Sequence, residues 1–162
     1  MPSSRNPLKQ ASNRLLHLAA RFLPGATSLR PLFHKLRGVN IQGKVFIGDD
    51  AYIENEYPEN VEIHDGAQIG LRAIIIAHFR GSGKVIIGEN VWIGPNCVIA
   101  ASSGQTVIIG NGSALAASAV VTTNIPPFTM VRGVPAKPVA KITVPMTMDT
   151  SFEDFTNGLK PL

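Results

Sequence analysis

Residues 85–99 read Val-Ile-Ile-Gly-Glu-Asn-Val-Trp-Ile-Gly-Pro-Asn-Cys-Val-Ile, and this stretch decides the fold. Within it an isoleucine recurs every six residues, at Ile87, Ile93 and Ile99. An α-helix would repeat its apolar residues every 3.6 positions and a half-buried strand every second position, so neither explains the pattern. A period of six indicates a short strand followed by a corner. Three such sides close one turn of a triangular prism in about 18 residues.

The same period extends in both directions along the chain. Steps of ten from Ile53 to Ile63 and from Ile99 to Ile109 predict two loop insertions, whereas the step of twelve from Ile75 keeps the period if Gly81 fills the empty position. Aliphatic residues occupy the other inward positions at Ile41, Ile47, Ile69, Leu115 and Val121. Small residues form a second series at Val45, Ala51, Ala67, Ala73, Val85, Val91, Cys97 and Ala119. Glycines follow the aliphatic residues at Gly48, Gly70, Gly88, Gly94 and Gly110, where a corner must avoid a Cβ clash.

The composition limits the class of protein. A chain of 162 residues with 44% hydrophobic, 16% charged and 6% aromatic residues can bury one aliphatic core and is not a disordered segment. The single cysteine, Cys97, excludes an intrachain disulfide and favours a reducing compartment, so we expect a cytoplasmic protein. No run of about 18 apolar residues predicts a membrane span, and no signal peptide is expected.

Charge is unevenly distributed along the sequence. The 48 residues before Asp49 contain eight Lys or Arg and no acid, whereas 49–65 contain seven acids and no Lys or Arg. Residues 90–148 again lack carboxylates. Such segregation predicts different partners for different parts of the molecule.

Both ends of the repeat are predicted to be capped, because an open end of a solenoid needs a cover. An amphipathic helix is expected over about 7–23, with its apolar face on the coils, followed by a short helical piece before Gly38. A basic amphipathic helix on an anionic membrane surface is the alternative. A last strand is expected through Met130 and Val131, then a short helix over 150–159. The predicted units are a cap over 1–38, a β-helix over 39–142 and a tail over 143–162.

The sixfold repeat resembles that of the hexapeptide-repeat acyltransferases, over about 37–142. The resemblance implies a left-handed parallel β-helix of four to five triangular coils. It also implies a homotrimer with active sites between subunits and acetyl-CoA as acyl donor, with no metal required. The branch that the sequence is most similar to acetylates hydroxyl groups of sugars or xenobiotics.

His78 is the candidate catalytic residue. It follows Ile74-Ile75-Ile76-Ala77 at a predicted corner, and an imidazole with a pKa near 6.5 can accept a proton from a hydroxyl group. The resemblance implies that this histidine is the general base and that Trp92, in the motif Val91-Trp92-Ile93-Gly94, lies near it and the cofactor. Strand alternation turns Trp92 outward, toward a subunit, a ligand or plain packing.

Further site residues follow from the resemblance and from charge. The final coil and tail motifs imply a coenzyme A groove, for which basic residues in a carboxylate-free segment suit the phosphates. The cofactor-binding candidates are Ala116, Ala117, Thr122, Thr123, Arg132, Pro135 and Lys137, with Lys141 as a further cation. The loop after Ile53 and the residues beyond His78 supply the substrate-binding candidates Asn55, Glu56, Tyr57 and Arg80.

Other histidines and Cys97 are given structural roles. His17 and His34 fall in the cap, His64 replaces a corner glycine, and Cys97 occupies a small inward position that predicts an inert thiol. Two alternatives remain open: N-acetylation of an amine, and a non-catalytic β-helix that binds or supports other molecules. A nucleic-acid partner is not expected, because no aromatic–basic platform accompanies the basic residues. The acceptor and the acyl-chain length are not determined by the sequence.

Overall fold

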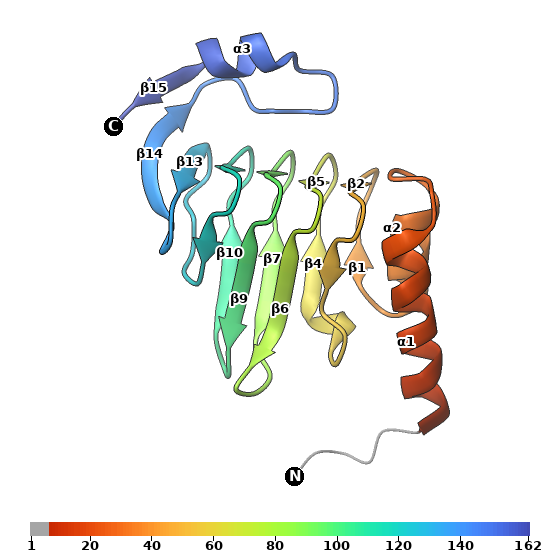
Figure 1. Ribbon diagram of the computed structural model, residues 1–162. Helices are drawn as coiled ribbons and strands as arrows, with labels where there is room; N and C mark the ends of the chain where they lie inside the picture. Colours follow the sequence, from red (N-terminus) through yellow and green to blue (C-terminus); the bar gives the residue numbers. More distant parts are fainter. Residues whose placement is uncertain (1–6) are drawn as a thin grey trace.

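The computed structural model describes residues 7–162, in which three sheets of parallel strands form a triangular solenoid (Figure 1). Sheet A contains β1 (Asn40–Ile41), β4 (Val61–Ile63), β7 (Lys84–Ile87) and β10 (Thr106–Ile109). Sheet B begins with β2 (Phe46–Ile47), β5 (Gln68–Ile69), β8 (Trp92–Ile93) and β11 (Ala114–Leu115). Sheet C contains β3 (Tyr52–Ile53), β6 (Ile74–Phe79), β9 (Val98–Ser102) and β12 (Val120–Val121). Consecutive strands belong to the three sheets in turn, so each set of three is one coil. The predicted β-helix is confirmed.

The sixfold series forms the core. In sheet B the register aligns Ile47, Ile69, Ile93 and Leu115 in one column, and all four side chains are completely buried. The residues of the small series are buried as well. Burial of each large aliphatic side chain contributes about 1.5–3 kcal/mol relative to exposure, so these columns supply most of the driving force for coil stacking.

Corner glycines are required by the next coil. A Cβ added to Gly70 would lie 2.5 Å from the carbonyl oxygen of Ile93, which belongs to the following coil. The left-handed turn itself falls two residues later, at Arg72, whose φ is 54°. Glycine is therefore required because a Cβ would clash, as predicted, but the clash is with the backbone of the next coil and not within the corner itself.

Three loops leave the prism at the edge between sheets C and A. They connect β3 to β4 through η1 (Pro58–Asn60), β6 to β7, and β9 to β10. Asn60 Nδ2 donates a hydrogen bond to Ser82 Oγ at 2.8 Å, and the N–H of Gly104 donates to the Ser82 carbonyl at 2.9 Å. The loops thus stack into one ridge. Gly81 lies exposed in the middle loop with φ 129°, so it does not fill a coil position as the step of twelve suggested.

Two helices, α1 (Pro7–Phe22) and α2 (Leu29–Leu36), cover the first coil at one end of the solenoid, as predicted (Figure 1). The orientation of α1 differs from the prediction. Its polar side chains face the coil: Asn13 Nδ2 donates to the Asn55 carbonyl at 2.5 Å, and Arg21 pairs with Asp50. Because the coil edge offers carbonyl and carboxylate acceptors, it binds the polar face of α1. The apolar face points outward.

The carboxyl-terminal segment folds back over sheet B. It contains β13 (Thr129–Arg132), β14 (Lys137–Ile142), α3 (Phe152–Asn157) and β15 (Leu159–Pro161). Ser151 caps α3 by accepting a hydrogen bond from the Asp154 N–H at 3.0 Å. Gln68 Nε2 donates to the Met146 carbonyl at 2.6 Å and ties the tail to β5. The strand through Met130 and the short helix were predicted; β14 and β15 were not.

None of the helices within residues 7–162 has the length and apolar character needed to cross a membrane.

Candidate active site

His78 lies near the end of β6 and is paired with a buried carboxylate. Its Nδ1 is 2.7 Å from Glu54 Oε1 and 2.8 Å from Glu54 Oε2. Glu54 follows β3 directly, and the register that pairs Ile53 with Ile75 brings its carboxylate under the β6 strand end. The His78 side chain keeps 34% of its surface exposed, whereas that of Glu54 has none. The buried Glu54 therefore binds Nδ1 of His78, while the rest of the ring remains accessible to solvent.

The surroundings of Glu54 keep its carboxylate ionised. Burial alone would raise its pKa, but hydrogen bonds from His78 and from the backbone N–H groups of Ala77, Tyr57 and Glu56 outweigh burial and lower the pKa. These backbone donors lie 2.6 Å, 3.0 Å and 2.7 Å from the carboxylate oxygens. An ionised carboxylate only accepts hydrogen bonds, so Nδ1 of His78 carries the proton. The lone pair on Nε2 is then available to accept another proton.

Arg37, just after α2, supports the backbone that carries Glu54. Its guanidinium donates to the carbonyl of Glu54 at 2.6 Å and to the carbonyl of Ile53. Its Nε donates to His34 Nδ1 at 3.0 Å. The buried His17 ring packs at 4.8 Å from the ring of Tyr52. The two cap histidines therefore have structural positions, as predicted.

An open groove of about 570 Å³ lies along sheet C in front of His78. Ile74 and Ile76 form its floor, and Tyr52 borders it. The rim is polar and consists of Arg21, Asp50, Arg72 and Asn96. Three of these rim residues come from successive corners between sheets B and C, while Arg21 comes from α1. The groove combines an apolar floor with both hydrogen-bond donors and acceptors around one imidazole.

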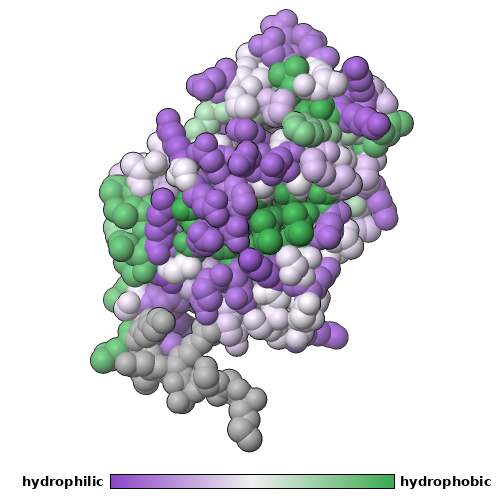
Figure 2. Space-filling view, turned by 180° about the vertical axis from the view of Figure 1, so that it is seen from behind, coloured by the Kyte–Doolittle hydropathy of each residue, from purple (hydrophilic) through white to green (hydrophobic). Residues whose placement is uncertain are grey.

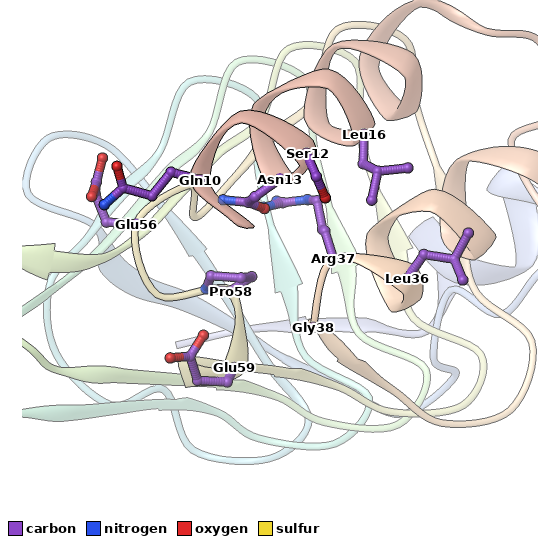
Figure 3. A pocket seen from close by; sticks show the side chains of 10 residues that line it. All are labelled: Gln10, Ser12, Asn13, Leu16, Leu36, Arg37, Gly38, Glu56, Pro58 and Glu59. Carbon is purple, nitrogen blue, oxygen red and sulfur yellow. The ribbon is translucent and has the colours of Figure 1, made fainter. Parts of the chain in front are cut away.

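A larger pocket of about 720 Å³ lies on another side of α1, between that helix, the end of α2 and the loop after β3 (Figure 3). Gln10, Asn13 and Leu16 line it from α1, with Glu56 and Glu59 opposite. His78 does not line it, and the residues that line it do not form a pair of an accessible base and a buried carboxylate. We therefore place the candidate active site in the smaller groove.

Trp92 lies away from His78 in this chain. It belongs to β8 of sheet B, whereas His78 belongs to sheet C. The indole is half-buried and packs against Phe155 of α3, with ring centroids 5.9 Å apart. The expected outward direction is correct, but the carboxyl-terminal tail of the same chain covers the ring. Within one chain Trp92 is a packing residue and contributes nothing to the His78 groove.

The cofactor candidates gather at the last coil. Ala116 and Ala117 form the corner after β11, in line with the corner that carries Asn96, and Thr122 and Thr123 follow β12. Arg132 and Lys137 are register partners at the turn between β13 and β14, and both are exposed. Pro135 lies in that turn, while Lys141 pairs with Thr129 at the far end of the hairpin. The structure brings Arg132 and Lys137 together and separates Lys141 from them.

The substrate candidates divide between two locations. The Tyr57 ring lies beside His78, with centroids 6.3 Å apart, and the Asn55 carbonyl is bound by α1. Glu56 faces the larger pocket and lies 3.9 Å from Arg14. Arg80 is exposed in the loop after β6 with its guanidinium 6.0 Å from the Phe79 ring. Of these four residues, Tyr57 is the one whose ring lies beside that of His78.

Cys97 and His64 occupy other environments. Cys97 is fully buried, its Sγ lies 3.0 Å from the Ala116 carbonyl, and burial raises the pKa of its thiol, so it is not a nucleophile. His64 Nε2 lies 2.7 Å from Glu62, on a different edge of the prism from His78. Among residues 7–162, no group of three or more His, Cys, Asp or Glu side chains is arranged to hold a metal ion.

Glu54 and Arg37 are the site residues that the sequence analysis missed. The strand register could have indicated Glu54. It directly follows the inward Ile53, it is the first residue of the predicted insertion, and it lies one coil before His78. A carboxylate there can reach the next coil because stacked strands lie only about 4.8 Å apart.

Comparison with known proteins gives relatives and similar structures but no matching family model. The chain is 30% identical over 126 residues to an Escherichia coli K12 protein named as an O-acetyl transferase of lipopolysaccharide biosynthesis, WbbJ, covering 62% of each chain. It is 48% identical over 56 residues to a Schizosaccharomyces pombe protein named as an acetyltransferase, covering 35% of this chain and 25% of that protein. The chain thus spans less than two thirds of the length of these curated relatives.

Two solved structures have the same fold over most of their length. A hexapeptide-repeat acetyltransferase of Vibrio cholerae in complex with acetyl-CoA aligns with a TM-score of 0.60 at 22% identity, covering 86% of this chain and 90% of that one. A galactoside acetyltransferase in complex with coenzyme A aligns with a TM-score of 0.57 at 24% identity, covering 83% and 81%. These alignments confirm the left-handed parallel β-helix. The chain is therefore similar in fold to a hexapeptide-repeat acetyltransferase and similar in sequence to proteins named as acetyltransferases, as its motifs predicted.

Proposed function

We propose that this protein transfers an acetyl group from acetyl-CoA to a hydroxyl group of a sugar-like acceptor, with His78 as the general base. The observation that carries the proposal is the pairing of an accessible His78 with the fully buried Glu54 at the head of a groove. The relatives named as acetyltransferases and the similar structures with coenzyme A bound support the same reaction class.

The mechanism follows from the protonation state of the pair. Nε2 of His78 takes the proton of the acceptor hydroxyl as its oxygen attacks the thioester carbonyl carbon, and the new C–O bond gives a tetrahedral intermediate. Backbone N–H groups at the coil corners would stabilise its oxyanion. Collapse breaks the C–S bond, and the imidazolium returns the proton to the departing thiolate. The buried, high-pKa Cys97 supports direct transfer without an acyl-enzyme.

Cofactor binding is assigned to the carboxyl-terminal end of the groove. When bound, acetyl-CoA supplies the activated thioester. The small corner residues Ala116 and Ala117 would let the pantetheine arm approach the backbone, with Thr122 and Thr123 at the next corner. Arg132 and Lys137, adjacent across the β13–β14 turn that contains Pro135, offer a paired cationic site for the phosphates. Trp92 is not included, because the tail covers it in this chain.

A hydroxyl acceptor suits the composition of the groove. Asp50 and Asn96 provide acceptor atoms, Arg21 and Arg72 provide donors, and Tyr57 provides an aromatic ring beside His78. Polar groups of both kinds around an apolar floor can orient a ligand through several hydrogen bonds. The relative named for O-acetyl transfer in lipopolysaccharide biosynthesis agrees with a glycan or glycan precursor.

We further propose a homotrimer in the cytoplasm, with contacts made by sheet C. Sheet B is covered by the tail, and the outer face of sheet A carries a Lys84–Glu62 ion pair at 3.1 Å. Sheet C instead turns apolar side chains outward, namely Ile74, Ile76, Val98, Ala100 and Val120. Such a face gains stability when a second subunit covers it, and the His78 groove would then lie at the boundary between subunits. The single cysteine fits a reducing compartment.

The test is release of free thiol from acetyl-CoA in the presence of a panel of sugars, sugar nucleotides and amines. We expect acceptor-dependent thiol release with hydroxylated acceptors, and a product whose new bond is an alkali-labile ester. Release only with amines, giving an alkali-stable amide, would favour N-acetylation. A protein that binds acetyl-CoA but transfers to none of the acceptors would instead be a binding module.

A further inference from the structure

The amino-terminal helices present an apolar surface to the outside of the molecule. Leu15, Leu18 and Phe22 recur at helical spacing on α1 and are all exposed, Leu15 by 69% and Phe22 by 66%. The opposite face of the same helix binds the solenoid through Asn13 and Arg21. A helix that served only as a cap would bury its apolar face and expose its polar face. In α1 the large apolar side chains are exposed instead, while His17 and Ala20 are buried against the protein.

The second helix extends this surface. Leu29, Leu32 and Leu36 recur on one face of α2 and are exposed, while Arg30 and His34 point into the protein. The two helices pack against each other, and green, apolar atoms gather along the edge of the molecule that they form, at the left of Figure 2. We call these six outward side chains the apolar stripe. Two neighbouring helices that both expose large aliphatic residues mark an interaction surface.

The charges around the apolar stripe define its partner. Within the first 48 residues there is no acid, and the three inward arginines are committed to Asp50, to Asp49 and to backbone carbonyls. Arg14 and Lys35 are exposed on the two helices, and Arg14 forms an exposed ion pair with Glu56 at 3.9 Å. The surface is thus apolar with a cationic margin, which complements an anionic lipid headgroup layer above hydrocarbon.

A second copy of the chain fits this surface less well. A twofold contact places the same patch on itself, so helices that carry no acid of their own would bring Arg14 and Lys35 of one copy toward those of the other. Like charges in contact oppose association, whereas anionic headgroups would neutralise them. The charges on the two helices therefore favour an anionic bilayer over a second copy of the chain as the partner.

We propose that α1 and α2 dock this protein on an anionic membrane surface, with the apolar stripe in the interface and Arg14 and Lys35 among the headgroups. The helices lie in the plane of the interface and do not span it. This inference stands independently of acetyl transfer, because it uses residues that line neither the His78 groove nor the candidate cofactor site.

Flotation with lipid vesicles tests the proposal. The full chain is mixed with phosphatidylcholine vesicles or with vesicles that also contain phosphatidylglycerol, and the bound fraction is measured at low and high salt. We expect binding to the anionic vesicles that weakens as salt rises. The double substitution Leu15→Gln with Phe22→Gln should lower the partition coefficient at least about tenfold, because two apolar side chains lose their burial. Arg14→Gln with Lys35→Gln should lower it by roughly the same factor.

The control is Leu162→Gln, which changes an equally exposed leucine at the other terminus and should leave binding unchanged. Light scattering without lipid follows the oligomeric state of each variant. The proposal is overturned if the wild type does not bind anionic vesicles or if the Leu15/Phe22 variant has the same partition coefficient as the wild type. A variant whose mass falls in the absence of lipid would show that a second copy covers the stripe, and would also overturn it.

Discussion

Glu54 determines what His78 can do, because a carboxylate bound by three backbone N–H groups cannot rotate to serve another partner. It holds Nδ1–H of the imidazole and leaves Nε2 as the proton acceptor. In the proposed reaction it would also stabilise the imidazolium that forms on His78. We regard Glu54 as a positioning residue and His78 as the catalytic residue, since only His78 reaches the groove.

Replacement of Glu54 by Gln should keep the His78 ring in place but change which ring nitrogen carries the proton. The amide NH₂ would face Nδ1 and favour the tautomer with the proton on Nε2, so kcat should fall by about 10²-fold or more with a smaller change in KM. Glu62→Gln, which changes the partner of His64, is the matched control. A kcat for Glu54→Gln within a few-fold of the wild-type value would remove Glu54 from the mechanism.

Some site residues could be predicted from the sequence and others could not. His78 could be identified because a histidine at a corner stands out against the aliphatic repeat. Glu54 could not be distinguished from its neighbours in the acid-rich loop, because its burial depends on the register between two coils. Trp92 was correctly turned outward by alternation, but its partner Phe155 lies 63 positions away in sequence, and nothing local predicts that contact.

At the scale of elements, the amino-terminal cap contains two buried, neutral histidines. Burial, with Arg37 and Arg21 nearby, lowers the pKa of His17 to about 4, and burial with Arg37 and His17 lowers the pKa of His34 to about 2. Both nitrogens of His17 and Nε2 of His34 have no hydrogen-bond partner among the described residues. The cap is therefore built around imidazoles that do not accept protons while it is folded.

The cap should lose stability in acid. Below pH 6.5 the unfolded chain protonates both imidazoles while the folded chain does not, so the free energy of unfolding falls as pH decreases, toward pH 4 for His17 and toward pH 2 for His34. Urea unfolding of wild type and of His17→Phe at pH 7 and pH 5 measures this. The variant should unfold with a similar midpoint at pH 7 and should lose less between pH 7 and pH 5, because one titrating group is gone. Equal losses in the two proteins would show that His17 titrates normally in the fold.

The strands of the solenoid could be predicted because the period of the apolar residues alone identifies them. The sixfold spacing predicted each inward isoleucine because every side of the prism repeats the same strand and corner. Amphipathicity predicted α1 but gave the wrong face, since a helical pattern says which residues share a face and not what covers it. The coil edge offers Asp50 and backbone carbonyls, and it bound the polar face.

The whole molecule separates its surfaces by charge and polarity. The outer side of the two helices is basic and apolar, the loop between β3 and β4 carries the exposed acids Glu56 and Glu59, and the segment 90–148, which includes the last coil, has no carboxylate. Sheet B is closed by the tail, while sheet C is apolar and carries the groove. The proposed bilayer and cofactor thus have separate surfaces, whereas the acceptor and a second subunit share sheet C.

Assembly should depend on sheet C. Val98→Arg places a charge in the middle of its outer face and should convert the proposed trimer to a monomer in light scattering, because the desolvated guanidinium would have no partner there. Thr106→Arg makes the same change on the outer face of sheet A and should leave the mass unchanged. Equal masses for wild type and Val98→Arg would exclude this face from the interface.

The most direct test compares two histidines that are each paired with a carboxylate. Thiol release from acetyl-CoA with the best acceptor is measured for wild type, His78→Ala and His64→Ala, each checked for an unchanged circular dichroism spectrum. The account predicts a loss of about 10²–10⁴ in kcat for His78→Ala and a rate close to wild type for His64→Ala. A folded His78→Ala protein that turns over within a few-fold of wild type would contradict the claim that His78, held by Glu54, is the general base.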